Sequence, residues 1–281
     1  MRGELKCPVC GASCRAGDGI RPADFIWCIG CGSSFVMPRA EAPGSHYESF
    51  GEFYGWRWEF SECLRDLSEL GVRGTLLEVG AGRGDFLQRL PRQLRGVGVD
   101  VNPAAVKAGR STGLDIRLGK LDHLCSEFRG RCDALAVFHV LEHLAYPAEF
   151  LSLASEFLTP GGVIVASVPN PNRTVAKVLA EPWDTPPHHV TRFSTRGLRR
   201  LLEQAGFVVS KVKDQPRDIS PRQLASLMAD AGVNRHPRLA HAARGRRLFK
   251  LPFALMALPG ALRACATGCG TALYIVGTRR A

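Results

Sequence analysis

Several features that define whole classes of protein are missing from this chain. No uninterrupted apolar run approaches the roughly 20 residues that a helix needs to cross a bilayer. The first residues, MRGELKCPVCG, lack the apolar core of a secretory signal, so we expect a cytoplasmic protein. The composition, 45% hydrophobic and 22% charged over 281 residues, excludes a wholly disordered, collagen-like or fibrous protein. This length suits one large α/β domain with a small appendage, or two modest domains.

Acidic residues are absent after Asp230, and this absence accounts for most of the net charge of +11. Nine Lys or Arg side chains lie in residues 231–281, whereas residues 1–230 carry 28 basic and 26 acidic side chains. The basic character therefore belongs to one segment rather than to the fold. A nucleic-acid partner is not predicted, because phosphate binding needs a basic footprint around the site.

Cysteine, by contrast, is plentiful, and ten cysteines without a secretion signal favour metal binding or free thiols over disulfides. Four of them form two CxxCG motifs, Cys7 with Cys10 and Cys28 with Cys31. Two such pairs provide the closed tetrahedral thiolate set of a structural zinc site. We therefore predict a zinc ribbon over residues 1–45 that the metal stabilises, with Cys14 as an alternative ligand. Unrelated buried thiols or a redox motif are the alternatives to zinc.

The glycine-rich segment that follows lacks the spacing of two common nucleotide-binding motifs. The apolar stretch Thr75–Val79 runs into three glycines spaced two apart: Gly80, Gly82 and Gly84. Asp85 stands where a dinucleotide fingerprint needs its third glycine, and the lysine of a P-loop is absent. Glu78 lies just before the glycines, where its carboxylate would meet a cation. This arrangement suits a positively charged amino acid moiety better than a pyrophosphate.

Apolar segments alternate with helical patterns along the chain, which predicts an α/β fold with a doubly wound, mostly parallel seven-stranded sheet. We expect its strands at residues 75–79, 96–100, 113–118, 134–138, 162–168, 207–212 and 272–277. Helices are expected within 46–71, over Asp85–Leu94, and over Thr195–Gln204 with Ser194 as its N-cap. Asp100 ends the second strand, where a ribose-binding carboxylate belongs in such sheets.

In combination these segments resemble the class I S-adenosylmethionine-dependent methyltransferases, and most closely the small-molecule group that contains ubiquinone-pathway and sugar enzymes. The matching stretches are LLEVGAGRGDFL, GVGVDVNP, CDALAVFHVLEHLAYP, LTPGGVIVASVPN and HHVTRFSTRGLRRLLEQAGF. The resemblance implies that S-adenosylmethionine is the cofactor and that the glycines line its methionine end, with Glu78 near its ammonium. It further implies that the ribose and adenine lie near Asp100, Val101, Leu121 and Asp122, and that Phe138 closes the pocket.

Histidines are the candidates for a general base, because methyl transfer to a hydroxyl needs a proton acceptor near neutral pH. We predict that His189 is the base, with His188 as its fallback, because both lie in a proline-stiffened loop that the family places over the acceptor. His143 is the next candidate, although the family's Glu-His pair is often structural. A magnesium site around Glu142 is a weaker alternative, since His139 stands where relatives offer a further acid.

The C-terminal region carries a basic and apolar insertion at about residues 231–268, inside a methyltransferase domain spanning 46–281. Packing on the domain is the favoured role of residues 244–263, and peripheral contact with the inner face of a membrane is the alternative.

The sequence as a whole predicts a methyltransferase acting on a small-molecule or glycan acceptor, with a sugar hydroxyl as the first choice. Sugar C-methylation, rRNA methylation and a non-catalytic cofactor-binding scaffold are the alternatives. No N/D-P-P-Y motif follows Phe138, which disfavours the exocyclic amino groups of bases.

Overall fold

A computed structural model describes residues 5–14, 24–37, 39–43, 55–177, 179, 184–234 and 251–280. The chain divides into two compact units. The larger unit holds Met1–Pro169, Trp183–Lys213 and Leu273–Ala281, and the smaller unit holds Asn170–Pro182 and Asp214–Ala272.

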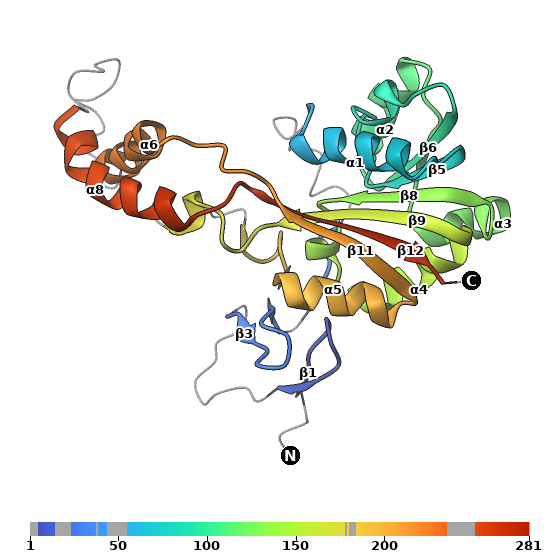
Figure 1. The fold of residues 1–281 in the computed structure, drawn as a ribbon, viewed down its shortest axis with the longest axis horizontal. Coiled ribbons are helices and arrows are strands. Elements are labelled where there is room, and N and C mark those ends of the chain that lie inside the picture. Colours follow the sequence, from blue (N-terminus) through green and yellow to red (C-terminus); the bar gives the residue numbers. More distant parts are fainter. Residues whose placement is uncertain are drawn as a thin grey trace. The chain divides into compact units, whose positions relative to one another are not determined.

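A seven-stranded sheet forms the centre of the larger unit (Figure 1), with the strand order β11-β12-β9-β8-β5-β6-β7. The strands from β9 to β7 pair in parallel. The Arg280 amide donates to the Gly206 carbonyl and the Gln215 amide donates to Ala272, so β11 and β12 run antiparallel. Their bounds are β5 Gly74–Val79, β6 Leu94–Asp100, β7 Ile116–Leu118, β8 Cys132–Phe138, β9 Leu158–Pro169, β11 Phe207–Asp214 and β12 Ala272–Arg279. The predicted fold class is confirmed.

Side-chain alternation along the strands creates two apolar faces, and helices cover both. Leu76 of β5 lies in the core under α1 and α2, whereas Leu77 lies in the core under α4 and α5. Figure 1 shows α1 and α2 on one side of the sheet and α4 and α5 on the other. These helices are α1 Trp58–Glu69, α2 Pro103–Ser111, α3 Cys125–Phe128, α4 Pro147–Phe157 and α5 Thr195–Gln204. Both cores hold the strand ends in place at the carboxyl edge.

The helix expected over Asp85–Leu94 is wrong. Only a 3₁₀ turn, η3 Leu87–Arg89, follows the glycine loop. Pro91 explains the difference, because a proline pushes the residue before it out of the helical region, and Leu90 has an extended ψ of 139°. By contrast, α5 has the predicted bounds, and the Ser194 hydroxyl accepts a hydrogen bond from the Gly197 amide as its N-cap.

The N-terminal segment is built from four two-residue strands: β1 Leu5–Lys6, β2 Ser13–Cys14, β3 Ile26–Trp27 and β4 Ser34–Phe35. The first two pair with each other, and β4 lies between β3 and β10 Thr191–Arg192. Phe35 is fully buried, in one apolar cluster with Phe193 and Leu198. The N-terminal segment therefore shares its core with the larger unit rather than forming one of its own.

The smaller unit contains the turn η6 Val175–Lys177 and two longer helices, α6 Pro221–Asn234 and α8 Leu251–Thr267. The helices bury Leu224 against Ala261 and Ala264, while α8 leaves Met256 82% exposed. Of the segment 244–263, for which packing was the favoured role and membrane contact the alternative, residues 244–250 lie outside the described residues and the rest belongs to α8. Within the described part of the chain, no helix combines the length and hydropathy that a membrane crossing requires.

Candidate functional site

The glycine loop after β5 bends tightly at the carboxyl edge of the sheet. Gly80, Gly82 and Gly84 all have positive φ values, of 76°, 56° and 85°. A Cβ at Gly80 would overlap the Val140 side chain, so the loop also depends on close packing. The Gly82 amide donates to a carboxylate oxygen of Asp100 at 2.7 Å, which ties the loop to the end of β6.

Asp100 has both oxygens engaged by backbone, since the Asn102 amide donates to the second one at 2.7 Å. A carboxylate oxygen can accept more than one hydrogen bond, so Asp100 retains capacity for ligand hydroxyls. Burial raises the pKa of Asp100. The carboxylate thus acts both as a brace for the loop and as an acceptor at the strand end.

Glu78 lies one residue before the loop and is 2% exposed. Among the described residues, its Oε2 atom has no hydrogen-bond partner. Burial, together with the nearby charge of Asp100, raises the pKa of Glu78 well above its usual range. A buried acid without a donor is costly, and a cationic group of a ligand would both ionise and satisfy it.

The remaining predicted cofactor residues differ in their surroundings. Val101 follows β6 and is half-buried, Leu121 is buried at the start of η4 Leu121–Leu124, and the Asp122 side chain is 61% exposed. Phe138 is 5% exposed and packs in an aromatic cluster with Phe60 and Phe86. The structure thus places these four residues at or shortly after the carboxyl ends of β6, β7 and β8.

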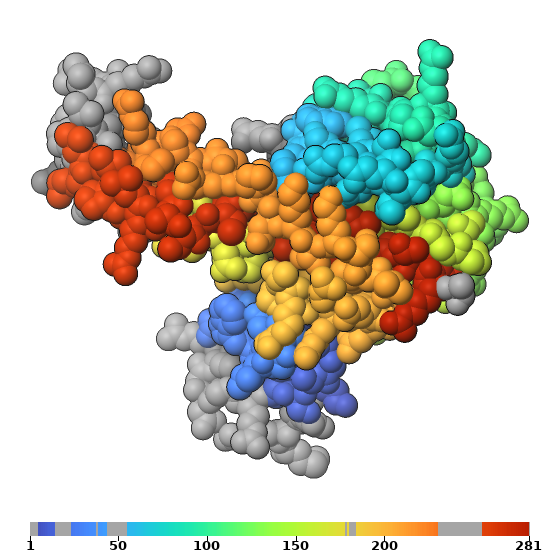
Figure 2. Space-filling model, in the orientation of Figure 1, coloured from blue at the N-terminus to red at the C-terminus, as the bar shows by residue number. Residues whose placement is uncertain are grey.

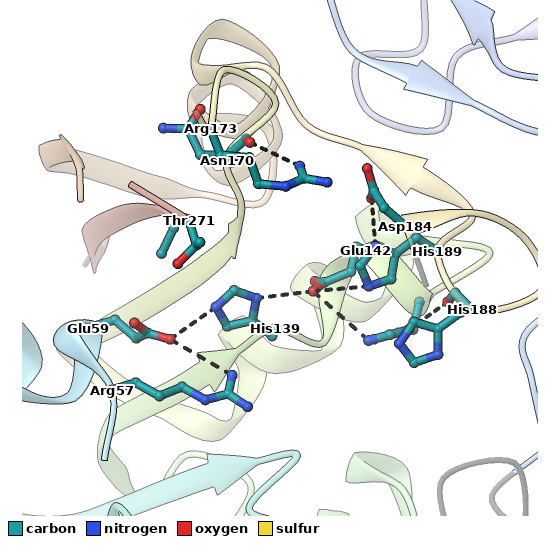
Figure 3. A network of polar contacts seen from close by, with 12 residues as sticks. Arg57, Glu59, His139, Glu142, Asn170, Arg173, Asp184, His188, His189 and Thr271 are labelled. Carbon is teal, nitrogen blue, oxygen red and sulfur yellow. Dashed lines mark hydrogen bonds and ion pairs between the residues drawn. The ribbon is translucent and has the colours of Figure 1, made fainter. Parts of the chain in front are cut away.

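A continuous row of polar side chains runs along the carboxyl edge next to this loop (Figure 3). It begins at Glu59 on α1, passes through His139 and Glu142 after β8, and reaches His189 and Asp184. Glu142 contributes from η5 Leu141–His143 and is 1% exposed. Within the described residues neither of its carboxylate oxygens makes a hydrogen bond of good geometry, and its nearest charged partner is Nδ1 of His139 at 3.4 Å. Such an unsatisfied buried carboxylate marks a place where a ligand donor would be stabilising.

His139 lies between two carboxylates and is held in a strained conformation. It is the one non-glycine residue with positive φ in the described part of the chain, at 53°. Its Nε2 is 3.0 Å from Glu59 and its Nδ1 is 3.4 Å from Glu142. Burial alone would lower the pKa of His139, but the hydrogen bonds and charges of these two acids raise it to about 9. His139 is therefore a cation at neutral pH and a poor base.

His143 has the opposite character, although it lies four residues away. Its Nδ1 is 2.6 Å from the backbone carbonyl of His188. Because a carbonyl only accepts, Nδ1 carries the proton and the lone pair is on Nε2. Burial lowers the pKa of His143 below its ordinary value against the opposing charge of Glu142, which favours a neutral ring at pH 7. The Nε2 atom lies 3.9 Å from Glu142, and the side chain is 17% exposed. These are properties of a general base.

The loop histidines complete the cluster, since one ring nitrogen from each of His143, His188 and His189 lies within 4.8 Å of the others. His189 is 3% exposed, and its Nδ1 is 2.8 Å from Asp184. Asp184 in turn lies 3.1 Å from the Arg192 guanidinium. The structure therefore brings all three predicted catalytic histidines together and encloses His189 most deeply. Among the described residues, the side chains close enough together here to bind one metal ion are the three imidazoles, whereas Mg²⁺ prefers oxygen ligands, so this arrangement does not favour the magnesium alternative.

Two members of this row, Glu59 and Asp184, and the arginine that pairs with Asp184, Arg192, were not found from the sequence. Glu59 lies in the first turn of an amphipathic helix, where an acid is ordinarily a solvated residue. Asp184 and Arg192 flank the histidine loop, and only their pairing in space shows that they orient it. The clustering of charged residues around the Pro-Pro-His-His segment is the one signal that could have indicated them.

The four predicted zinc ligands also converge. One sulfur from each of Cys7, Cys10, Cys28 and Cys31 lies within 4.8 Å of the others, with pairs at 3.8 and 3.6 Å. A tetrahedral site with Zn–S bonds of about 2.3 Å has sulfur–sulfur edges of about 3.8 Å, so this geometry fits zinc. Cys14 is outside the set, and its thiol donates to the Ala12 carbonyl at 3.6 Å. The structure shows a cysteine cluster that could hold a metal.

Known proteins resemble this chain over the region that carries the site. Residues 56–212 match the model of a methyltransferase domain family. A probable S-adenosylmethionine-dependent methyltransferase of Mycolicibacterium smegmatis is 34% identical over 48% of this chain and 52% of that protein. A ubiquinone biosynthesis O-methyltransferase of Xylella fastidiosa is 33% identical over 37% of this chain and 44% of that protein. The chain thus spans about half the length of these curated relatives.

Solved structures share the fold at low sequence identity. A putative sarcosine dimethylglycine methyltransferase from Galdieria sulphuraria is 14% identical, with a TM-score of 0.51 over 79% of this chain and 84% of that one. A putative methyltransferase complex with the Trm112 activator from Haloferax volcanii is 19% identical, with a TM-score of 0.51 over 85% and 94% of the two chains. The sheet order, the glycine loop with its acidic neighbours and the family match agree: the chain belongs to the class I S-adenosylmethionine-dependent methyltransferases.

Proposed function

We propose that this protein transfers the methyl group of S-adenosylmethionine to a hydroxyl group of a small molecule, with His143 as the general base. Sugar and glycan hydroxyls are the first acceptors to test. The observation that carries the proposal is the fixed tautomer of His143, whose unprotonated Nε2 lies 3.9 Å from the Glu142 carboxylate in a side chain that is 17% exposed. The name of the Xylella fastidiosa relative, an O-methyltransferase, supports oxygen as the methylated atom.

The glycine loop with Glu78 and Asp100, here called the cofactor end, fits S-adenosylmethionine. Gly80, Gly82 and Gly84 would lie against the methionine moiety, and the unsatisfied Glu78 would receive its ammonium. Asp100 would accept from the ribose hydroxyls, and Val101, Leu121, Asp122 and Phe138 would border the nucleoside. The cofactor supplies a methyl group on a sulfonium, which reacts by in-line displacement once an oxygen nucleophile is aligned with it.

The polar row with the three clustered histidines, here called the acceptor end, then needs only to orient a hydroxyl and remove its proton. The proton moves from the acceptor oxygen to Nε2 of His143 as the new carbon–oxygen bond forms, and the nearby carboxylate of Glu142 stabilises the resulting imidazolium. The neighbouring cation His139 keeps Glu142 ionised, because it helps to lower the pKa of Glu142 to about 2 against the effect of burial. His139 itself serves as a charged donor rather than a base.

The structural zinc remains part of this proposal. The four clustered cysteines would bind one Zn²⁺ in a closed site without an open position, so the metal would stabilise the N-terminal segment and would not contact the reacting groups.

The test is transfer of a labelled methyl group from S-adenosylmethionine to separated pools of sugar nucleotides and glycans, phenolic metabolites, and RNA. We expect label in a small-molecule pool, as a methyl ether whose carbon shift in NMR identifies an O–CH₃ group. A C–CH₃ product would overturn O-methylation in favour of the sugar C-methyltransferase alternative. Label confined to RNA, or cofactor binding without transfer to any pool, would overturn the small-molecule assignment.

A further inference from the structure

The N-terminal segment that holds the cysteine cluster contributes directly to the sheet that carries the histidine loop. Strand β4 pairs antiparallel with β10, so that Phe35 faces Thr191 and Ser34 faces Arg192. The Val36 amide extends the pairing by donating to the Val190 carbonyl. On the other side of the same residue, the Val190 amide donates to the carbonyl of Glu142. One short strand thus connects the cysteine segment with the site.

The second knuckle, Cys28–Gly32, also accepts hydrogen bonds from the N-cap residue and two arginines of α5, the helix that follows the loop. The Ser194 hydroxyl donates to the Cys31 carbonyl at 2.6 Å. Arg196 and Arg200 of α5 donate to carbonyls of the same knuckle, at Ile29 and Gly30. Figure 2 shows the blue N-terminal segment directly against the gold surface of this region. Carbonyls of a knuckle keep these positions only while its cysteines hold their fold.

The contact between knuckle and helix is close enough to leave no room for relaxation. A Cβ at Gly197 would overlap the Ser33 hydroxyl. Ser33 and Ser34 are fully buried, and Val190, Thr191 and Phe193 are each 1% exposed. A buried, tightly packed interface transmits a displacement of one side to the other.

Arg192 links this interface to the catalytic row. Its guanidinium lies 3.8 Å from the ring centroid of Phe25, three residues before Cys28, and 3.1 Å from the Asp184 carboxylate. Asp184 holds Nδ1 of His189 at 2.8 Å. The sequence of contacts therefore runs from the cysteine segment through Phe25, Arg192 and Asp184 to the histidine cluster.

We propose that the cysteine segment is a positioning element of the methyl-transfer site, with Arg192 as its link, so that metal occupancy at the four cysteines controls turnover but not cofactor affinity. This inference rests on the proposed function for its kinetic part. At the cofactor end, the glycine loop and Asp100 are braced by backbone amides of residues 82 and 102 and not by the cysteine segment. Metal loss should therefore disturb the acceptor end selectively.

The first experiment removes zinc from the full chain with a chelator and follows hydrogen exchange at residues 184–192. We expect protection of the Val190 and His189 amides to fall at least tenfold, while calorimetry gives an unchanged Kd for S-adenosylmethionine. Readdition of Zn²⁺ should restore protection. Unchanged protection in metal-free, folded protein would overturn the proposal, and this readout does not depend on identifying the acceptor.

The second experiment leaves the cysteines intact and removes the contacts. The double variant Arg196→Ala/Arg200→Ala should lower kcat about tenfold or more at constant cofactor Kd and full zinc content. Arg199→Ala is the matched control, because Arg199 lies on the same helix but pairs with Glu203.

A pair of single substitutions separates the contribution of Arg192 from that of the rest of the interface. Phe25→Ala removes the ring beneath Arg192, whereas Trp27→Ala removes a neighbouring aromatic that is 66% exposed. Phe25→Ala should reduce kcat and shift its pH profile, and Trp27→Ala should do neither. Equal effects of the two substitutions would refute the role of Arg192. Wild-type turnover in the arginine double variant, with protection at 184–192 intact, would refute the positioning role as a whole.

Discussion

The cofactor end of this site is formed mainly by backbone groups, whereas the acceptor end is formed mainly by side chains. At the cofactor end, backbone amides and glycines make the bracing contacts, and Asp100 lies 18 residues from Gly82 and two residues from Asn102 along the chain. At the acceptor end, side chains from α1, the segment after β8, the loop at 184–192 and the N-terminal segment must meet. The first end depends on local conformation, and the second depends on tertiary packing and charge.

This difference predicts that single substitutions will separate the two ends, and the largest effect is expected at the proposed base. His143→Gln should lower the single-turnover rate by about 10²–10⁴-fold, the usual contribution of a general base, with little change in cofactor Kd. Because burial lowers the pKa of His143, the wild-type rate should rise with pH below neutrality and then level off.

The original prediction that His189 is the base is tested by the same measurement. If His189 orients the cluster rather than accepting the proton, His189→Gln should reduce the rate less than His143→Gln does. The rate of His189→Gln should also still rise with pH below neutrality. Imidazole should partly restore the activity of whichever variant has lost the base. A larger loss and a flat profile in His189→Gln would assign the base to His189.

The next largest effect concerns the charge of His139. A histidine whose pKa is raised from its ordinary value of 6.5 to about 9 contributes stability that is fully present below pH 6.5 and is lost as pH rises through 9. That contribution is on the order of 3 kcal/mol at most. His139→Asn removes the charge while tolerating the left-handed backbone.

We expect chemical denaturation to show a large loss of unfolding free energy in His139→Asn at pH 6, shrinking toward zero by pH 10. His123→Asn is the control, because the His123 side chain is 63% exposed and its substitution should cost little at any pH. A difference that does not depend on pH would mean that the two carboxylates do not hold a charged imidazole.

The contrast between local contacts at the cofactor end and tertiary contacts at the acceptor end also explains how much could be predicted from the sequence. The strands, Ser194, Asp100 and the cysteine pairs follow from local patterns, and the structure has them where they were expected. The helix after the glycine loop was wrong because Pro91 acts over one residue, a local effect that periodicity overlooks. These correct and incorrect predictions all depend on interactions between residues that are close in the sequence.

What sequence could not supply is the acceptor end. Glu59 and His139 are 80 residues apart, and Ser34 and Arg192 pair through two-residue strands that have no periodicity to detect. Their contacts arise only from tertiary packing. The protonation of His139 and His143 could not be inferred either, because it depends on which carboxylates and carbonyls surround two chemically identical rings.

A moderate effect is expected at the cofactor end. Asp100→Ala should weaken S-adenosylmethionine binding by about 1.5–3 kcal/mol, the scale of a hydrogen bond to a charged group, and Gly82→Val should abolish binding by displacing the loop. Calorimetry measures both. Asp115→Asn, which alters a surface carboxylate paired with Arg117, is the control. Unchanged affinity in both Asp100→Ala and Gly82→Val would refute the assigned cofactor position.

The smallest effect is expected at Asn102, where a substitution tests whether changes at the cofactor end stay confined to that end. Asn102 is buried, and its side-chain oxygen accepts from the Ala104 and Ala105 amides as the N-cap of α2. Asn102→Ala should lower the unfolding free energy by about 1 kcal/mol, whereas Asn102→Ser keeps a capping oxygen and should lose less. Because the Asn102 amide that supports Asp100 belongs to the backbone, cofactor affinity should fall less than twofold in either variant. Hydrogen exchange at residues 184–192 should not change at all. A loss of protection there would show that the two ends are coupled through the sheet, and would contradict the separation from which these predictions start.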